Sequence, residues 1–223
     1  MILIRLPWAQ RLTAVASLGD AKRRDLYDYV SSSTAAVGRD AAAEALGMAR
    51  STASFHLDKL VEDGLLAVEF HKPAGKTGPG SGRPAKMYRA VIGEVGASVP
   101  DRNYDLAGEL LATAIEEAAQ SGTEVRQVLL TSSYQRGKEL ASGDSTLEAF
   151  LVNQGYAPRS DGQGGFVLPN CPFHRLSARH PGVVCAMNGA FLRGAAAGCG
   201  EAEKRITGNQ TAGQCCAHIT AAP

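Results

Sequence analysis

Five cysteines are the side chains best suited to chemistry, and all of them lie in the last quarter of the chain. They are Cys171, Cys185, Cys199, Cys215 and Cys216. Thiolates are soft ligands that suit iron–sulfur clusters and zinc. Because five is an odd number and the chain is expected to be cytosolic, metal binding or redox chemistry is favoured over structural disulfides.

The cysteine spacing by itself is a weak signal. Thirteen residues separate Cys171 from Cys185, thirteen more precede Cys199, and fifteen precede Cys215. These gaps are too wide for the close CxxC-type pairs of zinc knuckles and for compact ferredoxin runs. Buried cysteines that pack as small apolar side chains are the alternative explanation.

Geometry restricts the ligand set. If "VVCAMNGAFLRGAAAGC" forms one helix, Cys185 and Cys199 lie about 21 Å apart, so Cys199 is left out unless the helix breaks at a glycine. If "QCCAHI" is a strand, Cys215 faces one side while Cys216 and His218 face the other, and only one face meets the site. The fourth ligand stays open among His174, Cys199, Cys216 and His218.

An enzymatic reading has little support in the residues. Cys171 and His174 form the only local pair of nucleophile and base. The sequence contains no phosphate-binding loop, paired carboxylates or cofactor fingerprint. We therefore do not expect an enzyme.

The elements before the cysteines begin with helices. Residues 20–30 start with a possible N-cap aspartate, and "RDAAAEALG" is an alanine-rich helix with a glycine at its end. In "MARSTASFHLDKLVEDGLL", residues Ala53, Leu57, Leu60 and Val61 form an apolar stripe that ends before Gly64. Two helices joined by a tight glycine-containing turn predict a helix-turn-helix.

A basic hairpin follows these helices. "LLAVEFH" and "MYRA" are strand candidates, and the turn-rich segment "KPAGKTGPGSGRPAK" between them forms a wing. A winged helix-turn-helix places its second helix in the major groove and its wing along the backbone. The expected DNA contacts are Arg50, Ser51, Thr52, Ser54 and Lys59 on the helix, with Lys72, Lys76, Arg83 and Lys86 on the wing.

The segment "ALGMARSTASFHLDKLVEDGLL" resembles the recognition region of ArsR-type winged-helix transcription regulators. The resemblance covers about residues 10 to 90. It implies a double-stranded DNA operator as the partner.

The middle of the chain is expected to be helical. "YDLAGELLATAIEEAAQ" from Tyr104 is apolar on one side, and "EVRQVLLTSSYQRGKELA" continues as another helix. A helix after the wing commonly forms a dimer interface, although ordinary core packing explains the same pattern. "TLEAFLVNQGY" predicts a further helix, and a β-hairpin then leads to Cys171.

The segments "CPFHRLSARHPGVVC" and "CCAHI" resemble the C-terminal sensor domain of SufR-type regulators. These are ArsR-related repressors that bind an iron–sulfur cluster. The resemblance implies a homodimeric repressor whose DNA affinity depends on the cluster, with Cys171, Cys185 and Cys215 as ligands. The alternative is a winged-helix regulator that holds structural zinc, or no metal, and responds to another ligand.

Composition is consistent with a regulator of α+β fold. The net charge is +1, but residues 1–90 hold 13 Lys+Arg against 9 Asp+Glu, and residues 91–223 hold 10 against 13. No apolar run is long enough for a membrane span, so we expect a cytoplasmic protein. Three regions are predicted: a DNA-binding domain at 10–92, a helical dimerisation linker at 93–145, and a small α/β sensor domain at 146–223.

Overall fold

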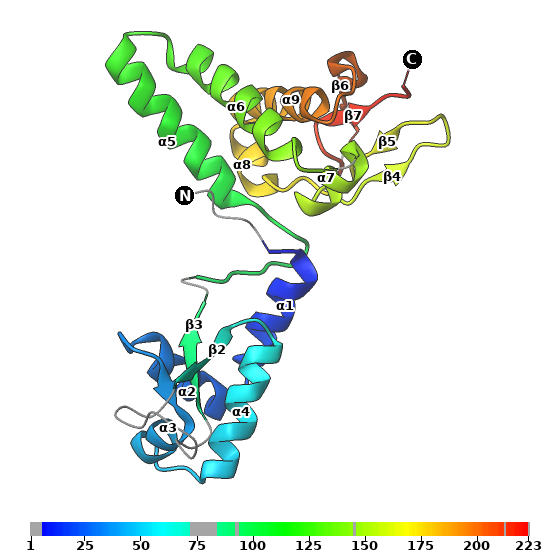
Figure 1. The fold of residues 1–223 in the computed structure, drawn as a ribbon. Helices are drawn as coiled ribbons and strands as arrows, with labels where there is room; N and C mark the ends of the chain where they lie inside the picture. Colours follow the sequence, from blue (N-terminus) through cyan, green and yellow to red (C-terminus); the bar gives the residue numbers. More distant parts are fainter. Residues whose placement is uncertain (1–5, 72–83, 92–93, 145, 212, 223) are drawn as a thin grey trace. The chain divides into compact units, whose positions relative to one another are not determined.

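The computed structural model describes residues 6–71, 84–91, 94–144, 146–211 and 213–222. The chain divides into two compact units, Met1–Ala97 and Ser98–Pro223. Figure 1 shows the elements of each unit. The second unit therefore contains most of the region that the sequence analysis treats as a separate linker, together with the cysteine-containing region.

The first unit is a set of short helices followed by a hairpin. Its elements are α1 Trp8–Ser17, α2 Ala21–Ser31, β1 Val37–Gly38, α3 Arg39–Ala45, α4 Arg50–Glu62, β2 Leu66–His71 and β3 Ala85–Ala90. The strands form an antiparallel sheet in the order β1-β3-β2. This is the element order of a winged helix-turn-helix.

Local sequence explains where these helices begin and end. The side chain of Asp20 accepts a hydrogen bond from the backbone N–H of Arg23 and caps α2. Gly64 adopts a φ of 79° after α4, a left-handed conformation that costs glycine little. The N–H of Leu65 then bonds to the carbonyl of Leu60, which closes the helix end and turns the chain into β2.

The core of the first unit joins the helices to the sheet. Leu57 and Leu60 of α4 are fully buried, as are Leu26 of α2 and Tyr88 of β3. These side chains belong to one apolar cluster. The burial of one face of α4 leaves its opposite face available at the surface.

The second unit combines long helices with a small sheet. Its helices are α5 Tyr104–Ser121, α6 Val125–Ala141, α7 Leu147–Asn153, α8 His174–Arg179, α9 Pro181–Gly198 and the 3₁₀ turn η1 Glu203–Arg205. Its strands are β4 Arg159–Ser160, β5 Phe166–Val167, β6 Ile206–Gly208 and β7 Ala217–Ile219, in the antiparallel order β4-β5-β7-β6.

Helices α6 and α9 lie side by side and pack through glycines (Figure 1). A Cβ atom on Gly137 of α6 would lie 2.0 Å from the carbonyl oxygen of Phe191. A Cβ atom on Gly194 of α9 would lie 1.9 Å from the carbonyl oxygen of Tyr134. Only glycine permits this backbone-to-backbone approach, which fixes how α9 and its Cys185 sit in the unit.

Most expected elements are confirmed. The structure contains the helices predicted over 20–30, at "RDAAAEALG", and after Met48, Tyr104, Glu124 and Thr146, as well as the wing strands and the hairpin before Cys171. The α+β class is also confirmed. "QCCAHI" differs, because the strand begins only at Ala217 and both cysteines precede it. No helix among the described residues is long and apolar enough to cross a membrane.

Candidate DNA-binding surface and thiol site

The turn between α3 and α4 presents the start of α4 at the surface. Gly47 in this turn has a φ of 61°, and Ala49 precedes the helix without a side-chain cap. An uncapped helix start offers backbone N–H groups and the positive end of the helix dipole to an anion such as a DNA phosphate.

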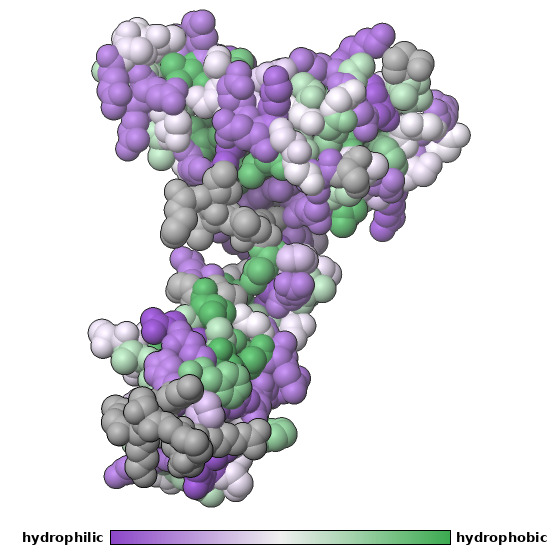
Figure 2. Space-filling model, viewed as in Figure 1, coloured by the Kyte–Doolittle hydropathy of each residue, from purple (hydrophilic) through white to green (hydrophobic). Residues whose placement is uncertain are grey.

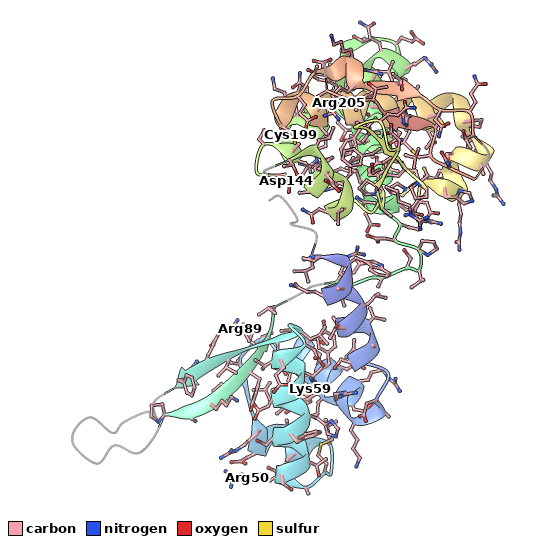
Figure 3. The ribbon with its side chains drawn as sticks, turned by 90° about the vertical axis from the view of Figure 1, so that its right-hand side faces the viewer. Arg50, Lys59, Arg89, Asp144, Cys199 and Arg205 are labelled. Carbon is pink, nitrogen blue, oxygen red and sulfur yellow. The ribbon has the colours of Figure 1, made fainter. Side chains whose placement is uncertain are left out.

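The predicted contacts on α4 lie on its exposed side. Arg50 and Ser51 are exposed, and Thr52 and Ser54 are partly exposed, whereas Ala53 is buried in the core. Four of the five predicted helix contacts are therefore gathered in the first turn and a half of α4. Figure 3 shows Arg50 at the start of α4 and Lys59 farther along the same helix.

Carboxylates accompany both cations on α4. The Nε of Arg50 lies 2.5 Å from Oδ1 of the exposed Asp40 of α3. Lys59 lies 3.1 Å from Glu62 and 3.2 Å from Asp63, and hydrogen bonds to these two carboxylates raise its pKa. The charge of Lys59 is thus locally balanced within the last turn of the helix.

An ion pair joins the wing to α4. Lys86 of β3 forms a salt bridge with Asp58, and the hydroxyl of Tyr88 donates to the same carboxylate oxygen over 2.7 Å. Partial burial is the largest influence on the pKa of Asp58 and raises it, but the bonds from Lys86 and Tyr88 outweigh burial, so the pKa is lowered. Of the other predicted wing contacts, Lys72, Lys76 and Arg83 lie outside the described residues.

The sequence analysis missed one basic residue on this surface. Arg39 is exposed at the start of α3, and its charge acts on Asp58 of α4. Phe55 is 65% exposed on α4 and contacts His56 edge-on. The position of Arg39 at the first residue of the first helix of the motif was the signal available in the sequence.

The thiol site lies in the second unit and draws its sulfurs from three segments. We use "thiol site" for Cys171 after β5, Cys185 in the first turns of α9, and Cys215 and Cys216 before β7. The thiols lie near enough to influence one another's pKa values, Cys171 with Cys215, Cys215 with Cys216, and Cys216 with Cys185. The fold therefore brings together all three of the predicted ligands, Cys171, Cys185 and Cys215.

These contacts divide the thiols by pKa. Hydrogen bonds from Cys215 lower the pKa of Cys171 and of Cys216. The same two bonds raise the pKa of Cys215, and burial raises that of Cys185. Cys171 and Cys216 are thus the thiols that lose a proton most readily, and thiolates are the metal-binding and nucleophilic form.

A buried amide adjoins the site. Asn188 of α9 is 1% exposed, and its Nδ2 lies 3.3 Å from Sγ of Cys215 and 3.8 Å from Sγ of Cys216. Its Oδ1 accepts a hydrogen bond from the hydroxyl of Tyr156 over 2.5 Å. Burial raises the pKa of Tyr156, so this hydroxyl keeps its proton. Sequence analysis missed Asn188 because a single asparagine in an apolar helix carries no pattern.

The other candidate ligands point elsewhere. Helix α9 is unbroken, and Cys199 at its C-cap contacts the carbonyl of Ala141 at 3.8 Å. Figure 3 shows Cys199 beside Asp144, whose charge contributes to raising the pKa of Cys199 after burial. His174 is exposed, and His218 pairs with Asp161 at 3.1 Å.

The four thiols form a row and do not surround one metal position. Among the described residues, no three His, Cys, Asp or Glu side chains are already placed to hold one metal ion. The donor set itself fits the chemistry, because four thiols suit a tetrahedral zinc ion or an iron–sulfur cluster.

Hydrogen bonds join the Cys171 segment to the chain that enters α5. The side-chain amide of Asn170 donates to the carbonyl of Asp101 over 2.9 Å, and Nη1 of Arg102 donates to the carbonyl of Cys171 over 3.3 Å. The N–H of Asn103 donates to the carbonyl of Pro172 over 3.1 Å. We call these bonds between residues 101–103 and 170–172 the entry clasp.

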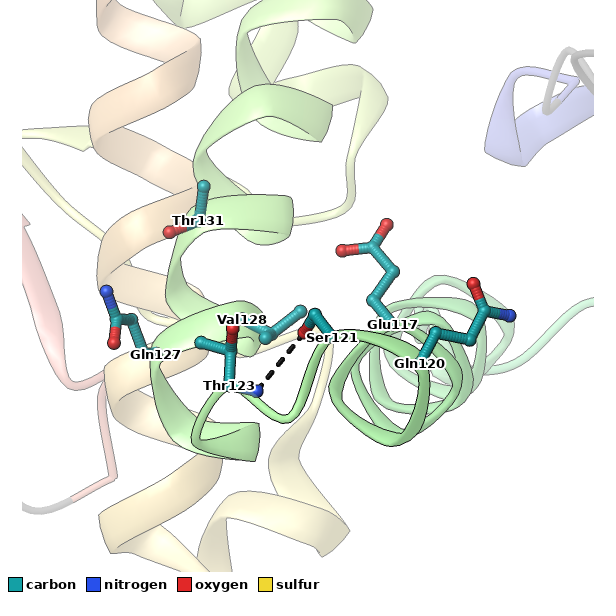
Figure 4. Close-up of a pocket in the computed structure, with 7 residues that line it drawn as sticks. All are labelled: Glu117, Gln120, Ser121, Thr123, Gln127, Val128 and Thr131. Carbon is teal, nitrogen blue, oxygen red and sulfur yellow. Dashed lines mark hydrogen bonds between the residues drawn. The ribbon is translucent and has the colours of Figure 1, made fainter.

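A surface pocket of about 470 Å³ lies at the turn between α5 and α6. Figure 4 shows its mainly polar lining, which includes Glu117, Gln120 and Gln127. It shares no residue with the thiol site and contains a single carboxylate. We assign it no chemistry.

Comparison with known proteins supports the N-terminal assignment. Residues 18–69 match the family profile of a helix-turn-helix domain, a span that includes α2, α3, α4 and most of β2. No curated protein and no solved structure gives a significant match to the chain. The matched profile and the order of α3, α4 and the β2–β3 wing identify the N-terminal unit as a winged helix-turn-helix, and they support a DNA-binding transcriptional regulator.

Proposed function

We propose that this protein is a cytoplasmic, homodimeric repressor that binds a double-stranded DNA operator with an affinity set by an iron–sulfur cluster at the thiol site. The observation that carries the proposal is the meeting of Cys171, Cys185 and Cys215 from three separate segments. Ordinary core packing gives no reason for four neighbouring thiols next to a buried amide donor.

At the DNA, the first turns of α4 read the major groove. Arg50 supplies a bidentate donor of the kind that recognises guanine, and Ser51, Thr52 and Ser54 supply hydroxyls for base edges and phosphates. Asp40 holds Arg50 when DNA is absent, so binding replaces one ion pair by another. On the wing, the cations Lys86, Lys72, Lys76 and Arg83 contact the DNA phosphate backbone. Lys59 contributes weakly because Glu62 and Asp63 balance its charge.

Dimerisation is assigned to an apolar groove of about 420 Å³ formed by α5, α6 and the start of α9. Ile115, Val125 and Val183 line it, with 60%, 48% and 43% of their surfaces exposed. Such side chains favour burial against a partner surface. Glu124 and Arg126 also line the groove, so a two-fold contact can place opposite charges together, which favours a second copy of the chain as the occupant.

The cysteines act as ligands, and the entry clasp connects them to the start of the second unit. Cys171, Cys185 and Cys215 would hold the cluster, which supplies sensitivity to oxidants or iron supply when bound. Movement of Cys171 on binding would be transmitted through the entry clasp to residues 101–103, where the second unit begins. Loading thereby shifts the population of dimers competent to bind the operator.

Zinc is the second candidate occupant. Its support is the presence of a fourth thiol, Cys216, in the same row, since a Cys₄ set is a common structural zinc site. A zinc-bound protein would be a winged-helix regulator that responds to another signal.

Anaerobic purification followed by iron, sulfide and zinc analysis of one sample tests these proposals. Matched iron and sulfide with visible-region absorbance support the cluster, and stoichiometric zinc without colour supports the second candidate. A protein that binds neither, even after attempted cluster reconstitution, contradicts both.

A further inference from the structure

Cys215 and Cys216 present both sulfurs to one side chain. Adjacent residues of a regular strand point to opposite faces, so a cysteine pair within β7 would divide its sulfurs. The strand begins only at Ala217, however, and the pair lies in the bend before it. Nδ2 of Asn188 consequently lies 3.3 Å from one sulfur and 3.8 Å from the other.

Cys216 also reaches the sulfur on α9. Its thiol lies near enough to both Cys185 and Cys215 for each of them to affect its pKa. It remains partly exposed, whereas Cys215 is buried.

We propose that Cys216 is the fourth sulfur ligand of the thiol site and that Asn188 holds it beside Cys215 by donating hydrogen bonds to both sulfurs. The inference rests on the proposed function, because it concerns the same site. It selects Cys216 over Cys199, whose sulfur contacts the carbonyl of Ala141, over the exposed His174 side chain, and over His218, which pairs with Asp161.

Asn188 is suited to this positioning role. The Tyr156 hydroxyl occupies its Oδ1, which directs the N–H₂ group toward the sulfurs. An amide donor stabilises negative charge on sulfur, and metal binding requires the thiols to lose their protons. Residues that orient metal ligands in this way typically change metal affinity about 10–100-fold when they are removed.

The test is a zinc and cobalt titration of the full-length chain, reduced and metal-free, against a competing chelator. The variants are Cys216→Ser and Cys216→Ala, with Cys199→Ser as the matched control because Cys199 lies at the other end of α9. Asn188→Leu removes the donor at similar volume. Far-UV circular dichroism checks that each variant is folded.

We expect Cys199→Ser to bind both metals as the wild type does. Both Cys216 variants should bind zinc more weakly and show less thiolate-to-cobalt charge-transfer absorbance, because one metal–sulfur bond is absent. Asn188→Leu should lose about 10–100-fold in affinity and keep that absorbance at saturation.

Two results overturn the inference in distinguishable ways. If wild type and the folded Cys216 variants bind equally with identical cobalt spectra, Cys216 is not a ligand, and the proposed function stands with three cysteines. If the wild type itself binds neither metal and accepts no cluster, the metal-binding part of the proposed function fails, and this inference fails with it.

Discussion

The side-chain amide of Asn170 donates to the backbone carbonyl of Asp101 over 2.9 Å. This bond places the residue before Cys171 against the chain that enters α5, and a second bond from Asn170 reaches the carbonyl of Gly155 over 2.5 Å. The second unit begins at Ser98, close in sequence to Asp101. A change at Cys171 therefore has a short hydrogen-bonded route to the point where the two units are covalently joined.

Replacing Asn170 by Ala should weaken the coupling between the thiol site and DNA. We expect the difference in operator affinity between loaded and metal-free protein to become about fivefold smaller. This change corresponds to a loss of about 1 kcal/mol of coupling free energy. Iron content should remain unchanged, since Asn170 supplies no sulfur. Fluorescence anisotropy with both forms measures the ratio, and Gln210→Ala on an exposed loop serves as control. An unchanged ratio in Asn170→Ala contradicts the role of the clasp.

Arg50 and Lys59 should contribute unequally to DNA binding. Arg50→Ala should reduce affinity for an operator selected from a random duplex library by about tenfold or more, because a bidentate base contact contributes about 1–3 kcal/mol. Lys59→Ala should change affinity less, since Glu62 and Asp63 already balance its charge. Salt-dependent binding isotherms give both effects, and a larger loss in Lys59→Ala would show that α4 is oriented differently on DNA.

The bond from Tyr88 to Asp58 should make the first unit sensitive to acid. The pKa of Asp58 is lowered in the folded protein, so its stabilising contribution is present above the unfolded-state pKa, about 4, and is lost as the pH falls through the lower folded value. The effect should be small because the Asp58 side chain is 44% exposed. The unfolding temperature of the first unit, residues 1–97, should fall less steeply below pH 4 in Asp58→Asn than in the wild type. Identical pH profiles of the unfolding temperature would exclude this contribution.

The glycine contact between α6 and α9 should not accept a methyl group. Gly137→Ala and Gly194→Ala place a Cβ about 2 Å from a carbonyl oxygen, so each should destabilise the second unit by about 1–3 kcal/mol or more. Gly108→Ala on α5 is the control, because nothing lies within 4 Å of its Cβ position. Helix propensity alone should make that variant more stable by up to about 1 kcal/mol. Chemical denaturation distinguishes the cases, and equal stability of all three variants would contradict the packing.

Ile115→Glu should weaken the proposed dimer by placing a charge in the apolar groove. Light scattering during gel filtration should show monomer at concentrations where the wild type is dimeric. Val152→Glu is the matched control, since Val152 is 57% exposed on α7 and does not line the groove. A monomeric wild type would contradict the proposed dimer. A dimer that Ile115→Glu leaves intact would show that the interface lies outside this groove.

The helical elements were predictable because their signals are local. The apolar stripe of α4, the cap at Asp20 and the stop at Gly64 depend on residues within a few positions of one another. The rise per residue of a helix also predicted that Cys185 and Cys199 lie far apart if α9 is continuous, and α9 is unbroken.

The thiol site was less predictable because it depends on tertiary contacts. Alternation along "QCCAHI" was applied to residues that lie before the strand, so it did not predict that the Asn188 amide reaches both Cys215 and Cys216. The role of Asn188 depends on Tyr156, thirty-two positions away, and the entry clasp joins residues about seventy positions apart. Such pairings leave no periodic trace in one sequence.

The most direct test of the central claim is operator affinity measured on one anaerobic preparation before and after cluster removal, with Cys171→Ser measured in parallel. We predict that the loaded and metal-free wild type differ in affinity and that Cys171→Ser, which cannot hold the cluster, behaves as the metal-free form in both samples. Equal operator affinity of the loaded and metal-free wild type would contradict the account.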